Sequence, residues 1–502
     1  MPDSDLIIST TAGDVRGSAR GSLHSWRGIP YAAPPIGDLR FRAPQPALPW
    51  EGVRDAIDFG KAPPQKPGTP ELGAGKRTPM GEDCLTVNVT RRATPAASPR
   101  PVVVWIYGGA YSFGSSGARA YNGSQFVENG DVVYVSFNYR LGALGYLDFT
   151  RYSTRERRFD SNLGPRDQLA ALQWVRDNIA AFGGDPANVT IIGQSAGANS
   201  VTTLMCVPAA HGLFARAIAL SSAPTSVYST ERSAAWASDF VKLLGGDDES
   251  AVATLTSATP EQLVAATEKL TKAAPEEAPG TLSLCPVVDG DFLPQYPVDA
   301  FREGTAARVP LIIGSMDREG AFFQKFIKVL PTTGPRVERM FEVTDPASRD
   351  RVIATYPGFP KPAVATDIAG DIIFWQPCLL VAEAHSQYAP TWSYRCDFAT
   401  PLLRLAGLGA THGMELGLIF AEPHLGISRM TQLLGGRRAA AAVSKRWHDR
   451  WIAFFTDGSV GADWPRYDAQ DRSTLIIDTT DRVEKDPRSV RREAWREYVN
   501  YR

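Results

Sequence analysis

Short apolar runs, many of them rich in β-branched residues, recur along the chain and constrain its fold more than any other feature. A strand that is buried on both faces needs a continuous apolar run, and parallel strands covered by helices are buried in this way. The sequence therefore predicts an α/β fold with a mostly parallel central sheet and helices on both faces. The runs that we expect to form strands lie at 102–107, 132–137, 189–192, 217–220, 311–313 and 392–396.

An amphipathic helix is expected between two of these runs, at residues 167–180. Leu172 and Val175 lie on one side of it at helical spacing. The glycine- and proline-containing segment 183–186 is a strong turn signal, so the helix should end before it.

The chain shows no clear linker, so we predict a single domain over residues 1–502. Helical insertions are expected around 224–280, which is rich in Ala, Glu, Lys and Thr, and around 335–390. Residues 63–81 are rich in Pro and Gly and lack aromatic side chains, which favours a polar surface loop.

The charge balance argues against two classes of partner. Lys and Arg number 53 and Asp and Glu 54, whereas a nucleic-acid-binding protein usually carries a basic excess. No apolar run approaches the roughly 18 residues that indicate a membrane helix. Residues 1–5 are acidic and no long apolar stretch follows them, which argues against a secretory signal. We expect neither a nucleic-acid nor a membrane partner.

The five cysteines do not form a recognisable framework. They are odd in number and widely spaced, with no CxxC pair and no His/Cys cluster at zinc spacing. We therefore expect free, buried thiols, a cytoplasmic protein, and neither a metal nor a cofactor. These cysteines are Cys84, Cys206, Cys285, Cys378 and Cys396.

A candidate nucleophile, Ser195, lies in a GxSxG pentapeptide at 193–197. The predicted strand 189–192 precedes it, and residues 196–205 can form a helix after it. A sharp strand-to-helix turn needs small neighbours and exposes the serine hydroxyl at its apex. The same turn directs free N–H groups of the helix toward the reaction site.

Candidate oxyanion donors lie in the loop after the strand 102–107. Gly109 and Ala110 have little or no side chain, so their N–H groups can approach a substrate closely. Ala196, directly after the nucleophile, supplies a third donor. Preorganised N–H groups stabilise the negative oxygen that forms when an ester is attacked.

A serine nucleophile also needs a general base, and His412 is the best candidate among six histidines. In this strand–turn–helix arrangement the order along the chain is serine, acid, histidine. His412 satisfies that order and lies in a loop of small residues. His424 is the second choice.

The acid should lie between Ser195 and His412, in the loop after the strand 311–313. Asp317 and Glu319 both qualify, because loops at strand ends are where α/β sheets place their chemistry. The chemistry of orienting an imidazole does not choose between them.

The chain resembles the type-B carboxylesterases, the cholinesterase-like branch of the α/β-hydrolases. The resemblance rests on long motifs in the order that this family has them, beyond the pentapeptide. They are Arg27-Gly28-Ile29-Pro30-Tyr31-Ala32, Glu82-Asp83-Cys84-Leu85-Thr86-Val87-Asn88-Val89, Phe137-Asn138-Tyr139-Arg140-Leu141-Gly142, Asn162-Leu163-Gly164 with Asp167-Gln168, and Phe182-Gly183-Gly184-Asp185-Pro186.

The resemblance implies an α/β-hydrolase fold and selects among the open alternatives. It makes Glu319, which precedes a glycine, the acid, and His412, in a HGxE-like stretch, the base. It also implies that Gly109, Ala110 and Ala196 are the oxyanion donors. Two structural ion pairs are implied as well, Arg40–Glu82 and Arg140–Asp167.

Three departures from the family pattern matter. Gln194 stands where the family usually has Glu, which removes a charge beside Ser195. The usual partner of Cys84 is missing from 59–65, so this thiol should be free. No aromatic residue occurs between Gly60 and Val104, so a cation–π surface for choline esters is not expected there.

Together, these residues predict a serine carboxylesterase that hydrolyses neutral esters of small to medium size through an acyl-enzyme. Its partner would be a small-molecule ester, and the protein would be a monomer or a weak homo-oligomer. The alternatives are a lipase-like enzyme, an amide or carbamate hydrolase, and, less favoured, a non-catalytic binding protein. Candidates to line an apolar cleft are Phe322, Phe323, Phe374, Trp375, Leu418 and Phe420.

Overall fold

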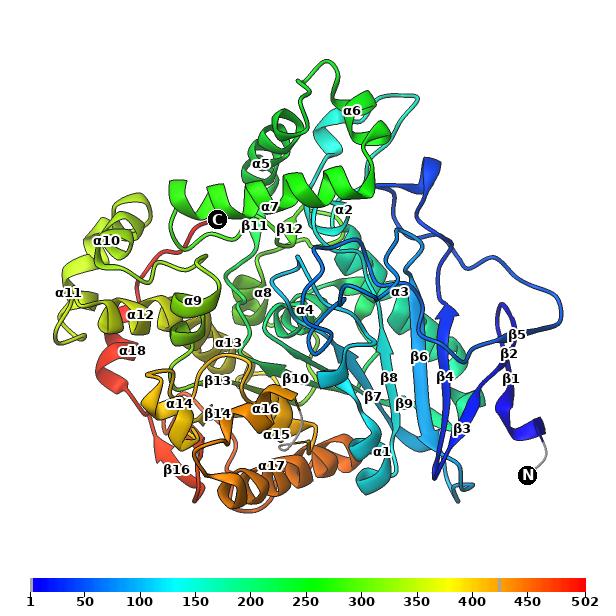
Figure 1. The fold of residues 1–502 in the computed structure, drawn as a ribbon. Coiled ribbons are helices and arrows are strands. Elements are labelled where there is room, and N and C mark those ends of the chain that lie inside the picture. Colours follow the sequence, from blue (N-terminus) through cyan, green and yellow to red (C-terminus); the bar gives the residue numbers. More distant parts are fainter. Residues whose placement is uncertain (1–2, 423–425) are drawn as a thin grey trace.

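An eleven-stranded mixed sheet runs through the molecule (Figure 1). The computed structural model describes residues 3–422 and 426–502. In order across the sheet, the strands are β16 (Arg482–Lys485), β15 (Ser473–Ile477), β14 (Thr391–Cys396), β13 (Leu311–Met316), β10 (Arg216–Leu220), β9 (Gly184–Gln194), β7 (Arg100–Ile106), β8 (Val133–Phe137), β6 (Thr86–Arg92), β4 (Leu23–Pro30) and β3 (Ser18–Arg20).

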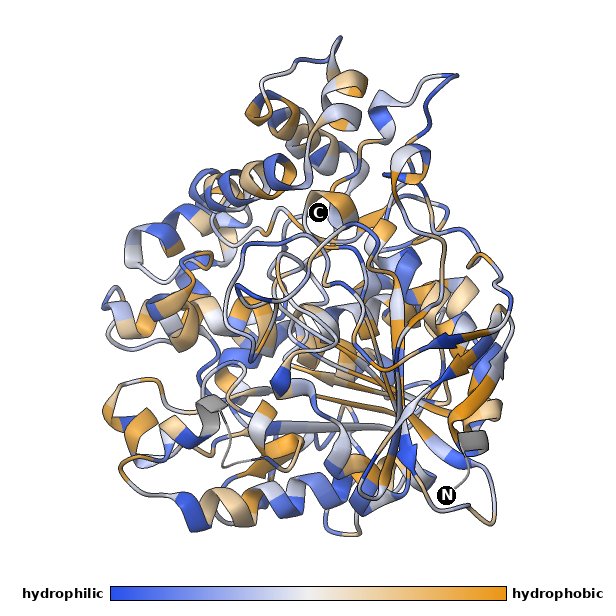
Figure 2. Cartoon of the chain, turned by 45° about the vertical axis from the view of Figure 1, so that its right-hand side comes forward, coloured by the Kyte–Doolittle hydropathy of each residue, from blue (hydrophilic) through white to orange (hydrophobic). Residues whose placement is uncertain are grey.

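The seven strands from β15 to β8 pair in parallel, and the outer pairs of the sheet are antiparallel. Val104 of β7 lies opposite both Val135 of β8 and Ile191 of β9, and all three side chains are fully buried. The central strands are correspondingly hydrophobic (Figure 2). The predicted mostly parallel α/β sheet is confirmed, because strands with both faces covered need such side chains.

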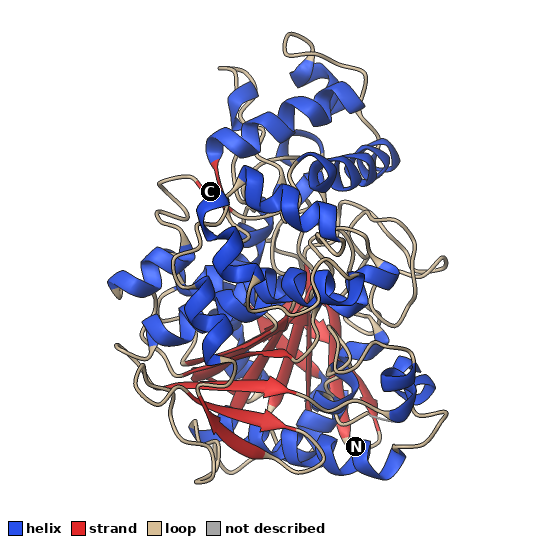
Figure 3. Cartoon of the chain, turned by 90° about the vertical axis from the view of Figure 1, so that its left-hand side faces the viewer, coloured by secondary structure: helices blue, strands red, loops and turns tan. Residues whose placement is uncertain are grey.

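Helices lie on both sides of this sheet (Figure 3). Those outside the two predicted insertions are α1 (Ser124–Gly130), α2 (Ala143–Tyr146), α3 (Leu163–Asn178), α4 (Ala196–Met205), α8 (Pro297–Glu303), α9 (Gly320–Phe326), α14 (Pro401–Leu405), α15 (Leu416–Ile419), α16 (Gly426–Thr431), α17 (Arg437–Asp457) and α18 (Ser489–Trp495). Two small sheets add β1 (Ile7–Thr10), β2 (Gly13–Arg16) and β5 (Val53–Asp55), and β11 (Tyr228–Ser229) with β12 (Val287–Val288).

The segments expected as insertions are largely helical. Residues 224–280 contain α5 (Thr230–Leu243), α6 (Ala251–Ser257) and α7 (Pro260–Glu277), which lie above the sheet in Figure 1. Residues 335–390 contain most of α10 (Gly334–Val343), with α11 (Arg349–Ile353), α12 (Pro362–Gly370) and α13 (Gln376–His385). The division into one domain with these additions stays a prediction.

A continuous helical stretch, Pro362–His385, is long and apolar enough to span a membrane by length and composition. It consists of α12, a π-helical turn at Asp371–Trp375 and α13. Within its apolar window, 78% is buried inside the protein. Packing in the core therefore accounts for its hydrophobicity.

Each of the six predicted runs forms a strand, and the helix expected at 167–180 is α3. The prediction of a turn at 183–186 is only partly right. Gly183 has a φ of +80° and ends the helical segment, as expected. However, β9 begins directly at Gly184, because that residue already pairs with Arg100 of β7.

Both ion pairs implied by the resemblance are present. Arg40 Nε donates to Glu82 Oε2 at 2.8 Å, and Arg140 Nε donates to Asp167 Oδ2 at 2.8 Å. The second pair is buried, with side-chain exposures of 2% and 0%. It joins the segment after β8 to α3.

Candidate active site

Ser195 stands at the sharp turn between β9 and α4, as the pentapeptide predicts. Its backbone has φ 58° and ψ −126°, a strained conformation for a residue with a side chain. Gly197 explains why the motif needs glycine: a Cβ there would lie 2.0 Å from the carbonyl oxygen of Ile106, at the end of β7. The turn thus packs directly on the neighbouring strand.

The structure brings Ser195, His412 and Glu319 into one hydrogen-bonded line. His412 Nε2 lies 2.8 Å from Ser195 Oγ, and His412 Nδ1 lies 2.6 Å from Glu319 Oε2. His412 and Glu319 are 6% and 3% exposed, so little water competes for these contacts. A hydroxyl, an imidazole and a carboxylate are therefore in the geometry that acyl transfer by a serine nucleophile requires.

Glu319 follows β13, and two hydrogen bonds hold the carboxylate oxygen that does not face His412. Oε1 accepts hydrogen bonds from the Met316 N–H at 2.7 Å and from Ser221 Oγ at 2.6 Å. Ser221 follows β10, the strand beside β13. With Oε1 held by two donors, Oε2 is directed to the imidazole.

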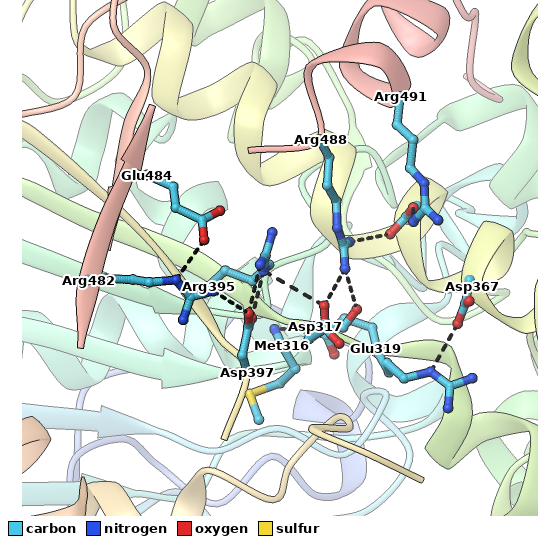
Figure 4. A network of polar contacts seen from close by, with 12 residues as sticks. Met316, Asp317, Glu319, Asp367, Arg395, Asp397, Arg482, Glu484, Arg488 and Arg491 are labelled. Atoms are coloured by element: carbon cyan, nitrogen blue, oxygen red, sulfur yellow. Dashed lines mark hydrogen bonds and ion pairs between the residues drawn. The ribbon is translucent and has the colours of Figure 1, made fainter. Parts of the chain in front are cut away.

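Asp317, the other candidate acid, lies against arginines rather than against His412 (Figure 4). Its carboxylate contacts Arg488 Nη2 at 2.5 Å and Arg395 Nε at 3.8 Å. Figure 4 shows Asp317 between these two arginines. Of the two acids left open by the sequence, only Glu319 contacts His412 within the described residues.

The loop that carries His412 is tied to the loop that carries Glu319. The Phe322 N–H donates to Thr411 Oγ1 at 2.8 Å, and the Arg318 N–H donates to the Ala410 carbonyl at 2.9 Å. The Phe374 ring lies against the imidazole, with ring centroids 4.5 Å apart. Sequence reasoning missed the contacts of Phe374 and Ser221, since neither residue belongs to a motif. His424 lies outside the described residues.

The loop after β7 lies beside Ser195. Gly109 and Ala110 have φ values of +120° and +49° and line the same cavity as Ser195. Neither N–H donates a hydrogen bond within the described chain, so both are available to a ligand. Ala196 opens α4, where the first N–H groups have no partner within the helix. Gly109 and Ala110 thus share the cavity of Ser195, and Ala196 directly follows it.

A cavity of about 310 Å³ opens in front of Ser195 and His412. Its wall is mainly apolar and includes Leu72 from the segment predicted as a polar surface loop. That prediction was incomplete, because Gln65 anchors the segment inward by donating to the Gly114 carbonyl at 2.7 Å. The aromatic residues of the wall are Phe113, Tyr121, Phe322, Phe323 and Phe420.

Three of the six apolar candidates therefore line the cavity: Phe322, Phe323 and Phe420. The other three, Phe374, Trp375 and Leu418, are buried in packed clusters instead. Glu422 also lines the cavity, and burial raises the pKa of its carboxyl.

Comparisons with known proteins identify a family and similar chains. The model of the carboxylesterase family matches residues 4–350. Para-nitrobenzyl esterase of Bacillus subtilis (strain 168) is 35% identical over 97% of this chain and 98% of its own. Phenmedipham hydrolase of Pseudarthrobacter oxydans is 35% identical over 94% of each chain.

Solved structures are similar over nearly the whole chain. A para-nitrobenzyl esterase structure has a TM-score of 0.87 at 34% identity and covers 98% of this chain and 99% of its own. A carboxylesterase structure from Geobacillus stearothermophilus has a TM-score of 0.83 at 32% identity. The match covers 98% of this chain and 100% of the esterase chain.

The sheet, the strained serine turn and the hydrogen-bonded line behind it define an α/β-hydrolase. More particularly, the chain belongs to the carboxylesterase family and is a carboxylic ester hydrolase. The predicted fold and enzyme class are confirmed.

Proposed function

We propose that Ser195, His412 and Glu319 form the catalytic triad of a serine carboxylesterase that acts on neutral esters of small to medium size. The observation that carries this proposal is the unbroken hydrogen-bonded line from Ser195 Oγ to Glu319 Oε2. It supplies the nucleophile, the base and the group that orients the base.

The reaction follows from this geometry. Ser195 Oγ attacks the ester carbonyl while His412 Nε2 takes its proton. The N–H groups of Gly109, Ala110 and Ala196 stabilise the negative oxygen, at about 2.7–4 kcal/mol per donor. His412 then gives the proton to the leaving alcohol, and an acyl-enzyme remains. Water attacks the acyl-enzyme by the same route and releases the acid.

The cavity supports the choice of substrate. About 310 Å³ with a largely apolar wall suits a small or medium uncharged group. A second cavity of about 580 Å³ shares Leu72, Phe113 and Ile327 with it, which leaves room for a longer group. The same attack is possible on a carbamate carbonyl, so carbamate hydrolysis is the alternative activity.

The cellular setting belongs to the same proposal. All five cysteines are free and buried, which suits a reducing cytoplasm. The three catalytic groups and the N–H donors perform the chemistry without a metal or a cofactor. We propose a monomer or a weak homo-oligomer.

The test is hydrolysis of p-nitrophenyl esters from acetate to palmitate, with Ser195→Ala as the matched variant. We expect the highest kcat/KM at short or medium acyl chains. Ser195→Ala should lower kcat by at least about 10⁴-fold while keeping the wild-type Tm. A folded Ser195→Ala variant with wild-type turnover would refute the role of Ser195.

A further inference from the structure

Glu415 carries a carboxyl that the proposed reaction does not use. Its residue is 0% exposed, and it follows His412 by three positions. Neither carboxyl oxygen has a hydrogen-bond partner among the described residues. Glu319, in contrast, accepts three hydrogen bonds, from Met316, Ser221 and His412. A buried carboxylate without donors is costly, so Glu415 favours its neutral form.

The groups around Glu415 shift its pKa in opposite directions. Burial first, and then the charge of Glu319, raise the pKa of Glu415 to about 7, whereas His412 opposes this shift. The side chains of Tyr394 and Cys396, on β14, also interact with the Glu415 carboxyl. Burial is the main cause of the raised pKa of each, and the charge of Glu415 raises it further.

Gln194 completes the surroundings from β9. Its Nε2 lies 3.4 Å from His412 Nε2, and its side chain also lies close enough to lower the pKa of Glu415. Because an amide carries no charge, Gln194 adds no second negative group here. With a pKa of about 7, the buried carboxyl of Glu415 can change its charge near neutral pH.

We propose that Glu415 is a positioning residue that acts through His412: the charge state of its buried carboxyl sets how readily His412 holds a proton. This inference rests on the proposed role of His412 as the base. A permanent second negative charge beside Glu319 would favour the imidazolium form, in which His412 cannot accept the serine proton. The neutral acid keeps the imidazole available.

The charge of Glu415 should change how kcat/KM depends on pH. Above about pH 7 Glu415 becomes ionised, and its charge favours protonated His412. The ionisation of Glu415 therefore moves the acid limb of the kcat/KM profile, its fall at low pH, to higher pH and broadens it. Glu415→Gln keeps the shape and fixes the neutral state. We expect its acid limb to move to lower pH by roughly 0.5–1 unit and to fit one ionisation.

A second variant makes the opposite change. Gln194→Glu places a carboxyl where the amide now lies 3.4 Å from His412 Nε2. We expect it to move the acid limb to higher pH. Asp317→Asn is the matched control, because it removes a nearby carboxylate that faces Arg488 and Arg395 instead. It should leave the limb in place.

The experiment measures kcat/KM for p-nitrophenyl butyrate from pH 5 to 9 for the wild type and the three variants, with the Tm of each. Opposite shifts for Glu415→Gln and Gln194→Glu support the inference. An unmoved acid limb in a Glu415→Gln enzyme that keeps its Tm overturns it, as does a downward shift for Gln194→Glu.

A measurement without turnover separates this inference from the proposed function. Histidine titration by NMR of isotope-labelled protein compares Ser195→Ala with Ser195→Ala/Glu415→Gln. A lower titration midpoint for His412 in the double variant supports the inference even if no ester is hydrolysed. An unchanged midpoint refutes it, whereas an inactive wild type would refute only the proposed function.

Discussion

Glu319 and Asp317 are two positions apart, yet their carboxylates have different surroundings. Glu319 Oε2 contacts the imidazole at 2.6 Å, whereas Asp317 pairs with Arg488. We therefore predict that Glu319→Gln lowers kcat far more than Asp317→Asn. In a serine triad, changing the acid to its amide costs about 10⁴-fold, because the imidazole loses its correct tautomer and orientation. Steady-state kinetics with p-nitrophenyl butyrate measures both variants.

Circular dichroism and Tm values for both variants show whether the fold is kept. If Asp317→Asn is the more damaging of two well-folded variants, Asp317 rather than Glu319 serves the imidazole. The expected ranking has a structural basis, since Ser221 and the Met316 N–H hold Glu319 toward His412.

At the residue scale, sequence motifs named the candidate site residues, but they did not show where each side chain points. Ser195 and His412 follow from a pentapeptide and from the chain order of a triad. The direction of Asp317 does not, because it depends on Arg488, 171 positions away along the chain. Glu415 is part of a predicted motif, but its burial and its lack of donors are properties of the packed structure.

At the scale of elements, the buried pair Arg140–Asp167 connects the segment after β8 to α3. We predict that Arg140→Met destabilises the protein by about 3–5 kcal/mol, because it leaves a fully buried carboxylate without its cation. Urea unfolding followed by tryptophan fluorescence measures this loss.

The exposed pair Arg16–Asp55 is the matched control, with side-chain exposures of 45% and 62%. Asp55→Asn should change the free energy of unfolding by less than about 1 kcal/mol. Equal losses for Arg140→Met and Asp55→Asn would show that burial of Arg140–Asp167 does not govern its contribution.

The central strands that sequence patterns predicted are buried on both faces. β7, β8 and β9 are covered on both faces, so their apolar runs are continuous. β4 contains His24 and Arg27 beside Trp26, and β16 is mostly exposed. Neither has a continuous apolar run, so antiparallel strands at the edges of the sheet escaped prediction.

At the scale of the whole molecule, all five thiols are free and buried. Burial raises the pKa of each one, for example Cys206 and Cys285, so thiolate is scarce at neutral pH. We predict that a thiol reagent reacts slowly with the folded protein and titrates five thiols in denaturant. Fewer than five in denaturant would contradict this prediction.

Glu415 also links pH to global stability. Its pKa is about 7 in the folded protein and, when exposed in the unfolded chain, close to the ordinary value of about 4.5. A raised folded pKa means that the folded state binds this proton more tightly. The stabilisation is therefore complete below about pH 4.5 and is lost as the pH rises through about 7.

Glu415→Gln removes this linkage, since its amide does not titrate. The stability difference between wild type and Glu415→Gln should therefore fall by about 3 kcal/mol between pH 4.5 and 8, to the disadvantage of the wild type. Thermal unfolding of both proteins at several pH values measures it. A difference that stays constant across this range would show that Glu415 is already ionised at pH 5 in the folded protein. Glu415 would then also be unable to govern the acid limb of activity, because its charge would not change across that limb.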